Sequence, residues 1–483
     1  MRIAVQSRSL NERVIAALEA RGSYAGWVLI AALAGVFATS FPITILTISL
    51  SSIAEEFGVR ETTIAWVVSA PILLSAVALP LLGKLGDLYG HRRVFLAGFC
   101  ASTLSAFATA LAWDAPSLIA LRTFSAIVGA ATQPAAMALI FNVYPAGGRV
   151  VPMGWWAMMG AAAPATGLVA GGPLVDLFGW RVVFVLQSAS ALVALIFASL
   201  VLKETPRQQA RFDFLGALTL SVGVGALMLA LGRVRDPGVS WMEIALSVVI
   251  GIVGILAFIR VEGRVEAPLL PLAYFRLPNF SAALLAGSFM GAAYMGAFVI
   301  APIVLLQLFH YSVTATAAIM LMRTMTLTVS SPMGARLGLR IGERAVSLLG
   351  SAIVAVSLMI VAGGCVWESL PVVCVGLVLQ GLGNGLGGPP MTTAAVDAVP
   401  IHDVGIAAAA SRLTSQVGVA FGITTLTMVY GGHNTGVGLA LAFLVGAGFA
   451  LCSLAAGVKM QRTRPRVEQL PEDAGDLNSP EFS

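Results

Sequence analysis

Three arginines lie within long apolar stretches of the chain, where charged side chains are rare. Arg122, Arg323 and Arg412 each fall inside a predicted apolar segment. A charge inside a bilayer is costly unless it faces a water-filled cavity or is paired, so such residues usually serve a function. We take these three as candidates for buried functional charge. The alternative for Arg323 and Arg412 is that they reach a membrane surface or bond to helix carbonyls.

Uncharged polar side chains in the same stretches could bind a solute by hydrogen bonds. The candidates are Gln133, Gln187, Gln307, Asn384 and Gln416. Acids follow a different pattern, since almost all of the 23 Asp and Glu residues fall between or at the ends of apolar stretches. Asp87 and Asp397 lie at such ends. A cavity with arginines and no carboxylate favours anionic or neutral amphipathic solutes over lipophilic cations.

The composition places these residues in a membrane. Hydrophobic residues make up 58% of the 483 residues, charged residues 11%, and the mean hydropathy is +0.91. Soluble domains hold roughly 25% charged residues, and lipid admits helices because it offers no partners to free backbone groups. We therefore predict an all-α membrane protein with fourteen spans. They lie near 26–50, 64–83, 93–112, 116–142, 151–175, 181–202, 214–232, 243–260, 280–306, 313–335, 346–365, 370–396, 405–430 and 436–458.

The basic residues predict the orientation of these spans. With both termini in the cytoplasm, 21 of the 28 Lys and Arg residues fall on the cytoplasmic side and four on the outer side. Cytoplasmic loops carry such an excess in cell-membrane proteins. The net charge of +5 thus fits membrane orientation and gives little support to nucleic-acid binding.

An internal repeat divides the chain. Seven residues recur at an offset of 252: Pro80, Leu85, Gly86, Gly90, Arg92, Leu96 and Gly98 return as Pro332, Leu337, Gly338, Gly342, Arg344, Leu348 and Gly350. Parallel repeats are typical of transporters that rock around a central site. We predict a cytoplasmic segment (1–25), a six-helix half (26–202), a linker with two extra helices (203–279), a second six-helix half (280–458) and a cytoplasmic tail (459–483).

Two motifs resemble those of the major facilitator superfamily. The loop 83–93 carries Gly83, Asp87, Gly90, Arg92 and Arg93 in the order of the family's signature. The resemblance implies a major-facilitator fold, in which this loop helps to hold the outward-facing state. The fifth span carries the second motif, similar to that of exporter members, in which glycine packing closes one gate. Its residues here are Pro164, Gly167, Gly171 and Gly172.

Further features resemble the fourteen-span drug:proton antiporter subfamily over about residues 26–460. Arg122, with Gln133 and Pro134 after it, partly matches a motif tied to proton transfer in the family, although Ala126 and Val128 replace its glycines. The chain also departs from the subfamily, because Pro42 stands where an acid is usual and Pro71 where a tyrosine is usual. These departures weaken the expectation of a cationic, proton-coupled cargo.

We therefore expect a secondary active exporter of amphipathic small molecules that works by alternating access as a monomer in the cell membrane. Proton-coupled antiport is expected from the resemblance, with a facilitator as the alternative. An exporter of lipid or cell-envelope precursor is the close competitor. An enzyme is disfavoured because HExxH, GxSxG, phosphate-loop and clustered metal-ligand motifs are missing from the sequence. A channel is disfavoured because the two-fold repeat and the gate motifs favour alternating access. No cofactor or metal is expected, and the partners are membrane lipid, the solute and protons.

Overall fold

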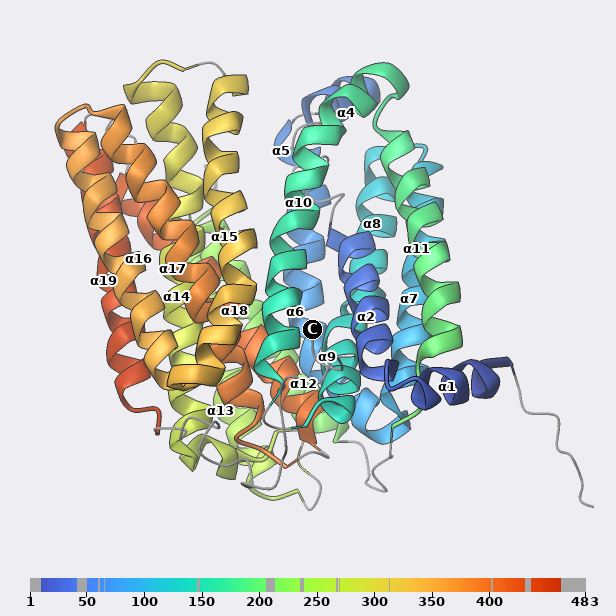
Figure 1. The fold of residues 1–483 in the computed structure, drawn as a ribbon. Coiled ribbons are helices and arrows are strands. Elements are labelled where there is room, and N and C mark those ends of the chain that lie inside the picture. The colour runs from blue at the N-terminus through green and yellow to red at the C-terminus, as the bar shows by residue number, and fades with distance from the viewer. Residues whose placement is uncertain are drawn as a thin grey trace, which may run out of the picture.

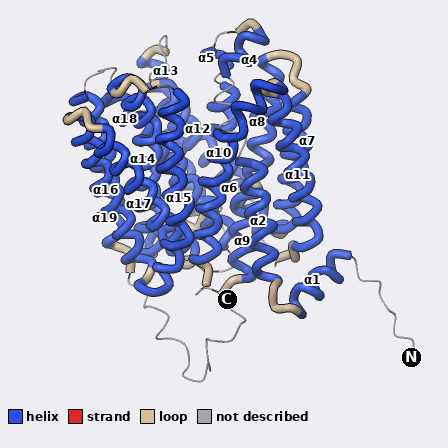
Figure 2. The backbone as a smooth tube through the Cα atoms, turned by 45° about the horizontal axis from the view of Figure 1, so that its top comes forward, coloured by secondary structure: helices blue, strands red, loops and turns tan. Residues whose placement is uncertain are grey.

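A computed structural model describes residues 10–40, 50–59, 61–64, 66–145, 148–205, 213–234, 239–265, 268, 270–311, 313–400, 403–430 and 436–461. The regular elements of this part are helices joined by loops (Figure 2). The α-helices are α1 (Leu10–Ala20), α2 (Tyr24–Ser40), α4 (Leu50–Phe57), α5 (Glu61–Ile64), α6 (Trp66–Tyr89), α7 (His91–Ala110), α8 (Ala115–Ala130), α9 (Thr132–Val143), α10 (Val150–Phe178), α11 (Arg181–Val201), α12 (Phe214–Arg233), α13 (Trp241–Glu262), α14 (Pro278–Ile303), α15 (Val313–Ile341), α16 (Glu343–Val366), α17 (Leu370–Val396), α18 (Val404–Tyr430) and α19 (Gly436–Val458). A 3-10 helix η1 (Leu272–Arg276) precedes α14, and a π-helical turn η2 (Val304–Leu308) ends it.

Most of the predicted membrane spans correspond to helices that are long and apolar enough to cross a bilayer. By length and composition, ten helices of the described residues can cross a membrane, or eleven if the bent helix α6 is a single span. The other predicted spans fall on α2, α10 and α15. The apolar described stretches of α2 and α10 are shorter, and α15 is rich in Thr, Ser and Arg. The all-α membrane fold is confirmed, while the count of fourteen stays a prediction.

The helices form two bundles, with α2–α11 on the right and α14–α19 on the left of Figure 1. In the first bundle α7 packs against α8 and α11, and α2 packs against α9, α10 and α11. In the second, α16 packs against α17 and α19, and α14 against α18. The short helix α1 lies at one end of the first bundle and α4 with α5 at the other. We call these the α1 end and the α4 end.

The two bundles repeat one turn in detail. Gly90 separates α6 from α7 with φ of 98°, and Gly342 separates α15 from α16 with φ of 88°. In each copy the glycine N–H donates to a carbonyl four residues earlier, over 2.9 Å, to Gly86 O and to Gly338 O. Positive φ is accessible to glycine at little cost. The offset of 252 seen in the sequence thus corresponds to one conserved backbone geometry in both bundles.

Helices α12 and α13 stand outside the two bundles, and α12 contacts both of them. Helix α12 packs against α6 of the first bundle and α18 of the second. Thr424 Oγ1 donates to Leu231 O over 3.1 Å, and the Arg233 guanidinium lies 5.5 Å from the Trp66 ring. Helix α13 packs on α12 where Gly254 and Gly223 meet, since a Cβ on Gly254 would lie 2.6 Å from the Gly223 Cα. Helix α12 therefore covers the seam between α6 and α18.

Candidate functional site

A cavity of about 160 Å³ lies between α2, α6, α7, α8, α9 and α11 of the first bundle and α18 of the second. Polar and charged side chains in its wall come from helices far apart in the sequence. They are Thr39, Ser75, Ser102, Arg122, Ser125, Gln133, Gln187, Arg412 and Gln416. Among the described residues that line it, there is no Asp or Glu. The wall is therefore positively charged and carries many hydrogen-bonding groups.

Helix α8 presents one face to the cavity. Its lining residues are spaced three or four apart, as a helical face requires: Arg122, Ser125, Ala126, Gly129 and Ala130. The helix begins at a capping box, in which Ser117 N donates to Asp114 Oδ1 over 2.8 Å and Asp114 N donates to Ser117 Oγ over 3.1 Å. Satisfying the free N–H groups at this end fixes where α8 starts, and so which face carries Arg122.

Arg122 and Gln187 are two buried polar residues of the wall. Arg122 is 7% exposed and Gln187 is 2% exposed. Within the described residues, neither Arg122 Nε nor Gln187 Oε1 has a hydrogen-bond partner. The two serines close by are engaged with each other, because Ser125 Oγ donates to Ser102 O over 3.2 Å. Buried polar groups without partners are unusual, and in a cavity wall they mark where a solute or water would bind.

The opposite wall comes from α18. Arg412 and Gln416 lie four residues apart on this helix and both face the cavity. Arg412 is exposed to this open space, unlike Arg122. Gln133 at the start of α9 completes the polar lining. Pro71, where the sequence departs from the subfamily, also lines the cavity. The other departure, Pro42, lies outside the described residues.

Arg323 lies away from this cavity, inside the second bundle, and is 1% exposed. Its Nε donates to Gln380 Oε1 over 2.6 Å and its Nη2 to Tyr294 O over 2.8 Å. The guanidinium also lies 3.6 Å from the Tyr294 ring centroid and 4.8 Å from that of Phe298. These contacts join α14, α15 and α17. They correspond to the alternative in which this arginine bonds to a helix carbonyl.

Two further candidates also lie outside the cavity lining. Gln307, in η2, accepts a hydrogen bond from Tyr430 Oη over 2.6 Å. Asn384 is half-buried on α17. The cavity thus brings together Arg122, Arg412 and three of the five uncharged candidates, and leaves Arg323, Gln307 and Asn384 elsewhere.

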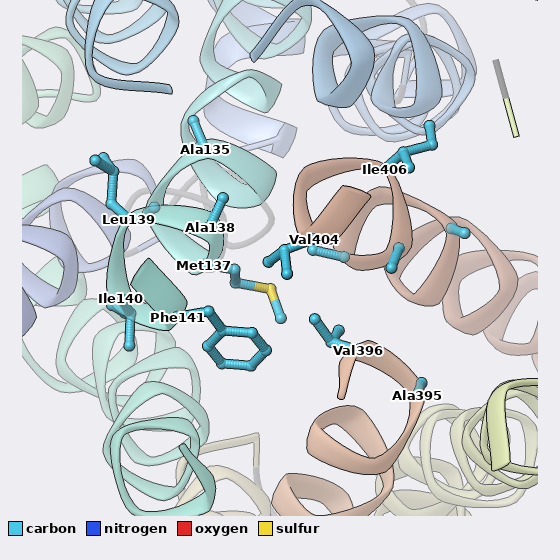
Figure 3. Close-up of a cluster of buried hydrophobic side chains, with 14 of the residues drawn as sticks. Ala135, Met137, Ala138, Leu139, Ile140, Phe141, Ala395, Val396, Val404 and Ile406 are labelled. Atoms are coloured by element: carbon cyan, nitrogen blue, oxygen red, sulfur yellow. The ribbon is translucent and has the colours of Figure 1, made fainter. Parts of the chain in front are cut away.

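An apolar layer closes the α1 end of the cavity. Just beyond Gln133, α9 contributes the buried residues Ala135 to Phe141, and α17 and α18 contribute Ala395, Val396, Val404 and Ile406. Figure 3 shows Met137 and Phe141 pointing toward Val396 and Val404 of the other bundle. We call these residues the apolar seal. Because apolar side chains packed this closely exclude water, the two bundles are joined here by hydrophobic contact.

The last two turns of α6, which carry the first part of the motif 83–93, lie against the start of α18. Asp87 is 1% exposed, and its Oδ1 lies 3.1 Å from His91 Nε2. A Cβ added to Gly405 of α18 would lie 2.5 Å from Asp87 Oδ1, so only glycine allows this approach. A Cβ on Gly83 would likewise lie 2.7 Å from Ala409 Cβ. A carboxylate at a helix N-terminus interacts favourably with the helix dipole, which adds to this contact between bundles.

The arginines of the same loop bind within the first bundle. Arg92 Nη2 donates to Ser199 O over 2.9 Å, and its backbone N–H donates to Glu204 Oε1 over 3.1 Å. Arg93 Nε lies 3.6 Å from Glu204 Oε2. Glycine is favoured at position 90 by its φ of 98°, and a Cβ there would also lie 2.4 Å from Glu204 Oε1. The structure therefore places Asp87 at the bundle interface and the arginines at the end of α11.

An ion pair that the sequence did not indicate joins the bundles beside the apolar seal. Arg149 Nη1 lies 2.6 Å from Asp397 Oδ1, and both side chains are largely buried. Arg149 also donates to Phe141 O over 2.9 Å and to Tyr144 O over 3.2 Å. Asp397 was noted as an acid at a span end, but its partner is 248 residues away in the chain.

A contact made by a second acid, at the start of α18, was likewise not predicted from the sequence. Asp403, 8% exposed, accepts a hydrogen bond from Tyr274 Oη of η1. Burial raises the pKa of Tyr274, and its hydrogen bond to Asp403 raises the pKa further. The phenol is therefore the donor at neutral pH, and it ties the linker before α14 to α18.

The glycine-rich motif falls on α10, but the side chains of Pro164, Gly167, Gly171 and Gly172 lie outside the described residues. Earlier on the same helix, Gly154 packs on α15, where a Cβ would lie 2.5 Å from Ala335 Cβ. The residues just after the motif are described at the α4 end. Arg181 and Trp180 both donate to Glu56 of α4, Trp180 Nε1 over 2.6 Å. These contacts fix the start of α11 within the first bundle.

A family model described as "Major Facilitator Superfamily" matches residues 32–304 and 282–481. Among curated relatives, the "Multidrug resistance protein Stp" of Mycobacterium tuberculosis is 29% identical over 405 residues, 83% of this chain and 75% of that protein. The "Multidrug transporter protein MdtP" of Bacillus subtilis is 28% identical, covering 80% of this chain and 72% of the relative. The "Tetracenomycin C resistance and export protein" of Streptomyces glaucescens is 26% identical, covering 93% and 82%.

Solved structures share the fold at low sequence identity. The human organic anion transporter MFSD10 (TETRAN) superposes with a TM-score of 0.63 at 17% identity, covering 91% of this chain and 99% of that one. The proton:xylose symporter XylE superposes with a TM-score of 0.65 at 12% identity, covering 92% and 97%.

Proposed function

Because the chain belongs to the major facilitator superfamily, we propose that it exports amphipathic small molecules by alternating access of the central cavity. The observation that carries the proposal is a polar cavity between two bundles that the apolar seal joins at the α1 end. The named export and multidrug functions of the relatives support the direction of transport. The chain acts as a transporter, not an enzyme.

We further propose that the α1 end faces the cytoplasm and that both termini lie there. The excess of basic residues on that side supports this orientation. The described contacts between the bundles, Asp87 with Gly405 and Arg149 with Asp397, then close the cytoplasmic side. This arrangement corresponds to an outward-facing state held by Asp87 and its loop. Transport requires these contacts to break, so that the bundles rock about the cavity as a single functional chain.

Anionic or neutral cargo is the substrate class that the cavity favours. Arg122 and Arg412 give its wall positive charge, and no acid is present among its described lining residues to compensate them. A cationic wall attracts anions and repels lipophilic cations. A lipid or cell-envelope precursor with an anionic group meets the same requirement and remains the second candidate.

Coupling to protons is proposed from the likeness to drug:proton antiporters. The acids that can supply it are Asp87 and Asp397, because both lie in contacts that form or break as the bundles rock. Protonation of either carboxylate removes its charge and weakens the contact that closes the cytoplasmic side. Inverted vesicles with an imposed pH gradient and a true substrate in the external medium test this. Failure of the gradient to drive uptake of a true substrate contradicts antiport and leaves a facilitator.

The central experiment is an export screen across cationic, neutral and anionic compounds in cells and in proteoliposomes. Wild type is compared with Arg122→Gln, Arg323→Ala and Arg412→Gln. We expect export of anionic or neutral compounds, with loss of export in the two cavity variants. Robust export of a quaternary cation that none of the three substitutions alters would contradict the substrate class. Mass spectrometry of co-purified lipid separates the drug-like from the lipid cargo.

A further inference from the structure

The wall of this cavity of about 160 Å³ has an unused donor and an unused acceptor, and we call the part of the wall that these two residues line the Arg122–Gln187 corner. Arg122 Nε on α8 and Gln187 Oε1 on α11 are buried, line the same cavity, and lack a partner among the described residues. Their side chains are 7% and 2% exposed, so bulk water reaches them poorly. Burying polar groups without partners is unfavourable, and a ligand that satisfies both therefore gains more affinity here than at an exposed site.

The neighbouring serine hydroxyls already form hydrogen bonds with other protein groups. The hydroxyls of Ser102 and Ser125 lie 3.3 Å apart and Ser125 Oγ also donates to Ser102 O. No hydrogen bond joins either serine to Arg122 or Gln187 within the described residues. Within the described residues the protein leaves both atoms unsatisfied, so a solute or water in the cavity can supply the partner.

The two unpartnered atoms determine which ligand groups can bind to them. A guanidinium N–H binds an oxyanion best, because the hydrogen bond is charge-assisted. An amide oxygen accepts a hydrogen bond, which requires a hydroxyl or N–H on the ligand. With Arg412 on the opposite wall and no acid in the described lining, an oxyanion is favoured over an ammonium group. A ligand that satisfies both atoms therefore carries an oxyanion together with a hydroxyl or N–H donor.

We propose that the Arg122–Gln187 corner is a subsite for a hydroxy-carboxylate group, or a group of like chemistry that pairs an oxyanion with a hydroxyl. Arg122 binds the oxyanion and Gln187 Oε1 accepts from the hydroxyl. Arg412, which is exposed to the cavity, contributes attraction for the anion without contacting this group. The subsite rests on the proposed export function, and it names the polar group by which an amphipathic cargo is held.

Three probes that share a naphthalene ring test the subsite on the full-length protein in lipid nanodiscs. They are 1-naphthylacetate, 1-naphthylglycolate, which adds the hydroxyl, and 1-(1-naphthyl)ethylammonium, which carries the opposite charge. Affinities are measured by isothermal titration calorimetry. For wild type we expect the glycolate to bind about tenfold more tightly than the acetate, since one hydrogen bond to a buried acceptor is worth about a factor of ten. The cation should bind most weakly.

Two substitutions separate the roles of the corner residues. Gln187→Leu should abolish the preference for glycolate over acetate and leave the affinity for acetate within about twofold, because only the acceptor is lost. Arg122→Gln should weaken both carboxylates by about tenfold or more and leave the cation unaffected or tighter. Arg122→Lys, which keeps the charge, should retain the preference for carboxylates over the cation in part. Thermal melting of each variant shows that it is folded.

Gln307→Leu is the matched control, because Gln307 lies outside the cavity lining. It should bind all three probes as wild type does. Equal binding of glycolate and acetate to wild type, or an undiminished glycolate preference in Gln187→Leu, would overturn the subsite. If either of these results is obtained while the export screen detects transport of any compound, the subsite is wrong but the proposed transport function is retained. Absence of export of every compound tested would instead overturn the function itself.

Discussion

Arg149 and Asp397 form an ion pair across the two bundles, with Nη1 and Oδ1 2.6 Å apart beside the apolar seal. Arg149 also binds two carbonyls at the end of α9, so the pair couples that helix end to α17. A partly buried pair with these additional hydrogen bonds is stronger than an exposed one. The contact is thus positioned to hold the α1 end of the cavity closed.

Breaking this pair should open the α1 end. We expect Arg149→Met or Asp397→Asn to destabilise the present arrangement by about 1–3 kcal/mol, or roughly five- to a hundredfold in population. A cysteine that replaces Ser75 in the cavity, in a background without native cysteines, reports how accessible the cavity is from the outer side. Its alkylation by a membrane-impermeant maleimide added from the outer side should slow. Lys203→Met, which breaks the exposed Lys203–Glu19 pair within one bundle, is the control and should change nothing.

Asp87→Asn should impair transport and leave membrane insertion intact. Asp87 is buried against the first turn of α18 rather than in the middle of a span, and the substitution removes a charge that the helix N-terminus favours. Export rate and the amount of protein in the membrane are measured together. Asp114→Asn, at the α4 end, serves as the comparison. Normal export by Asp87→Asn would contradict the role of this loop.

Gly405→Ala should disturb the same interface by steric means. The new Cβ would lie 2.5 Å from both Asp87 Oδ1 and His91 Cε1, a distance at which atoms must move apart. We expect a melting temperature lower by several degrees and altered cavity accessibility, because over-packing costs about 1–3 kcal/mol. Gly448→Ala is the matched control, since its Cβ would meet nothing within 4 Å. Equal effects of the two substitutions would argue against a tight contact at Gly405.

Arg323→Ala should cost more stability than Arg412→Ala. Arg323 is fully enclosed and its loss leaves Gln380 Oε1 and Tyr294 O without their donor, so we expect a cost of roughly 2–4 kcal/mol. Arg412 is exposed to the cavity, and its removal should leave thermal unfolding nearly unchanged. Thermal unfolding in detergent compares them. If both variants melt alike, Arg323 does not join α14, α15 and α17 as described.

Glu56 should make a small, pH-dependent contribution at the α4 end. Burial alone would raise the pKa of Glu56, but hydrogen bonds from Arg181 and Trp180 and the charge of Arg181 together lower it below its ordinary value. A lowered pKa means that the stabilisation is present above the ordinary carboxyl pKa and is lost as pH falls through the folded-state value. Because both side chains are 41% exposed, the gain is under about 1 kcal/mol.

The measurement is thermal unfolding of wild type and Glu56→Gln from pH 7 to pH 3. Wild type should melt at the higher temperature near neutrality, and the difference should vanish at the acidic end. A difference that stays constant with pH would show that the ionised carboxylate is not the stabilising form.

The sequence by itself determined the class of this protein. Long apolar stretches cannot remain in water, and the repeated turn residues require the same positive φ at Gly90 and Gly342, so helices, membrane and internal repeat follow from local composition and spacing. The loop and span motifs also led to the superfamily. Arg122, Gln133, Gln187, Arg412 and Gln416 were found because polar groups in apolar stretches are conspicuous along the chain.

Only the tertiary structure decided which of these residues act together. Arg323 and Arg122 look alike in sequence, yet one binds carbonyl and amide oxygens inside a bundle and the other lines the cavity. The Arg149–Asp397 pair spans 248 residues, and Arg122 and Gln187, whose atoms lack partners within the described part of the chain, come from different helices. Helix periodicity fixes the face on which a residue lies, but what that face meets depends on how the helices cross. Pairing and burial, which set the energy of a charge in a membrane, are therefore properties of the packed bundles.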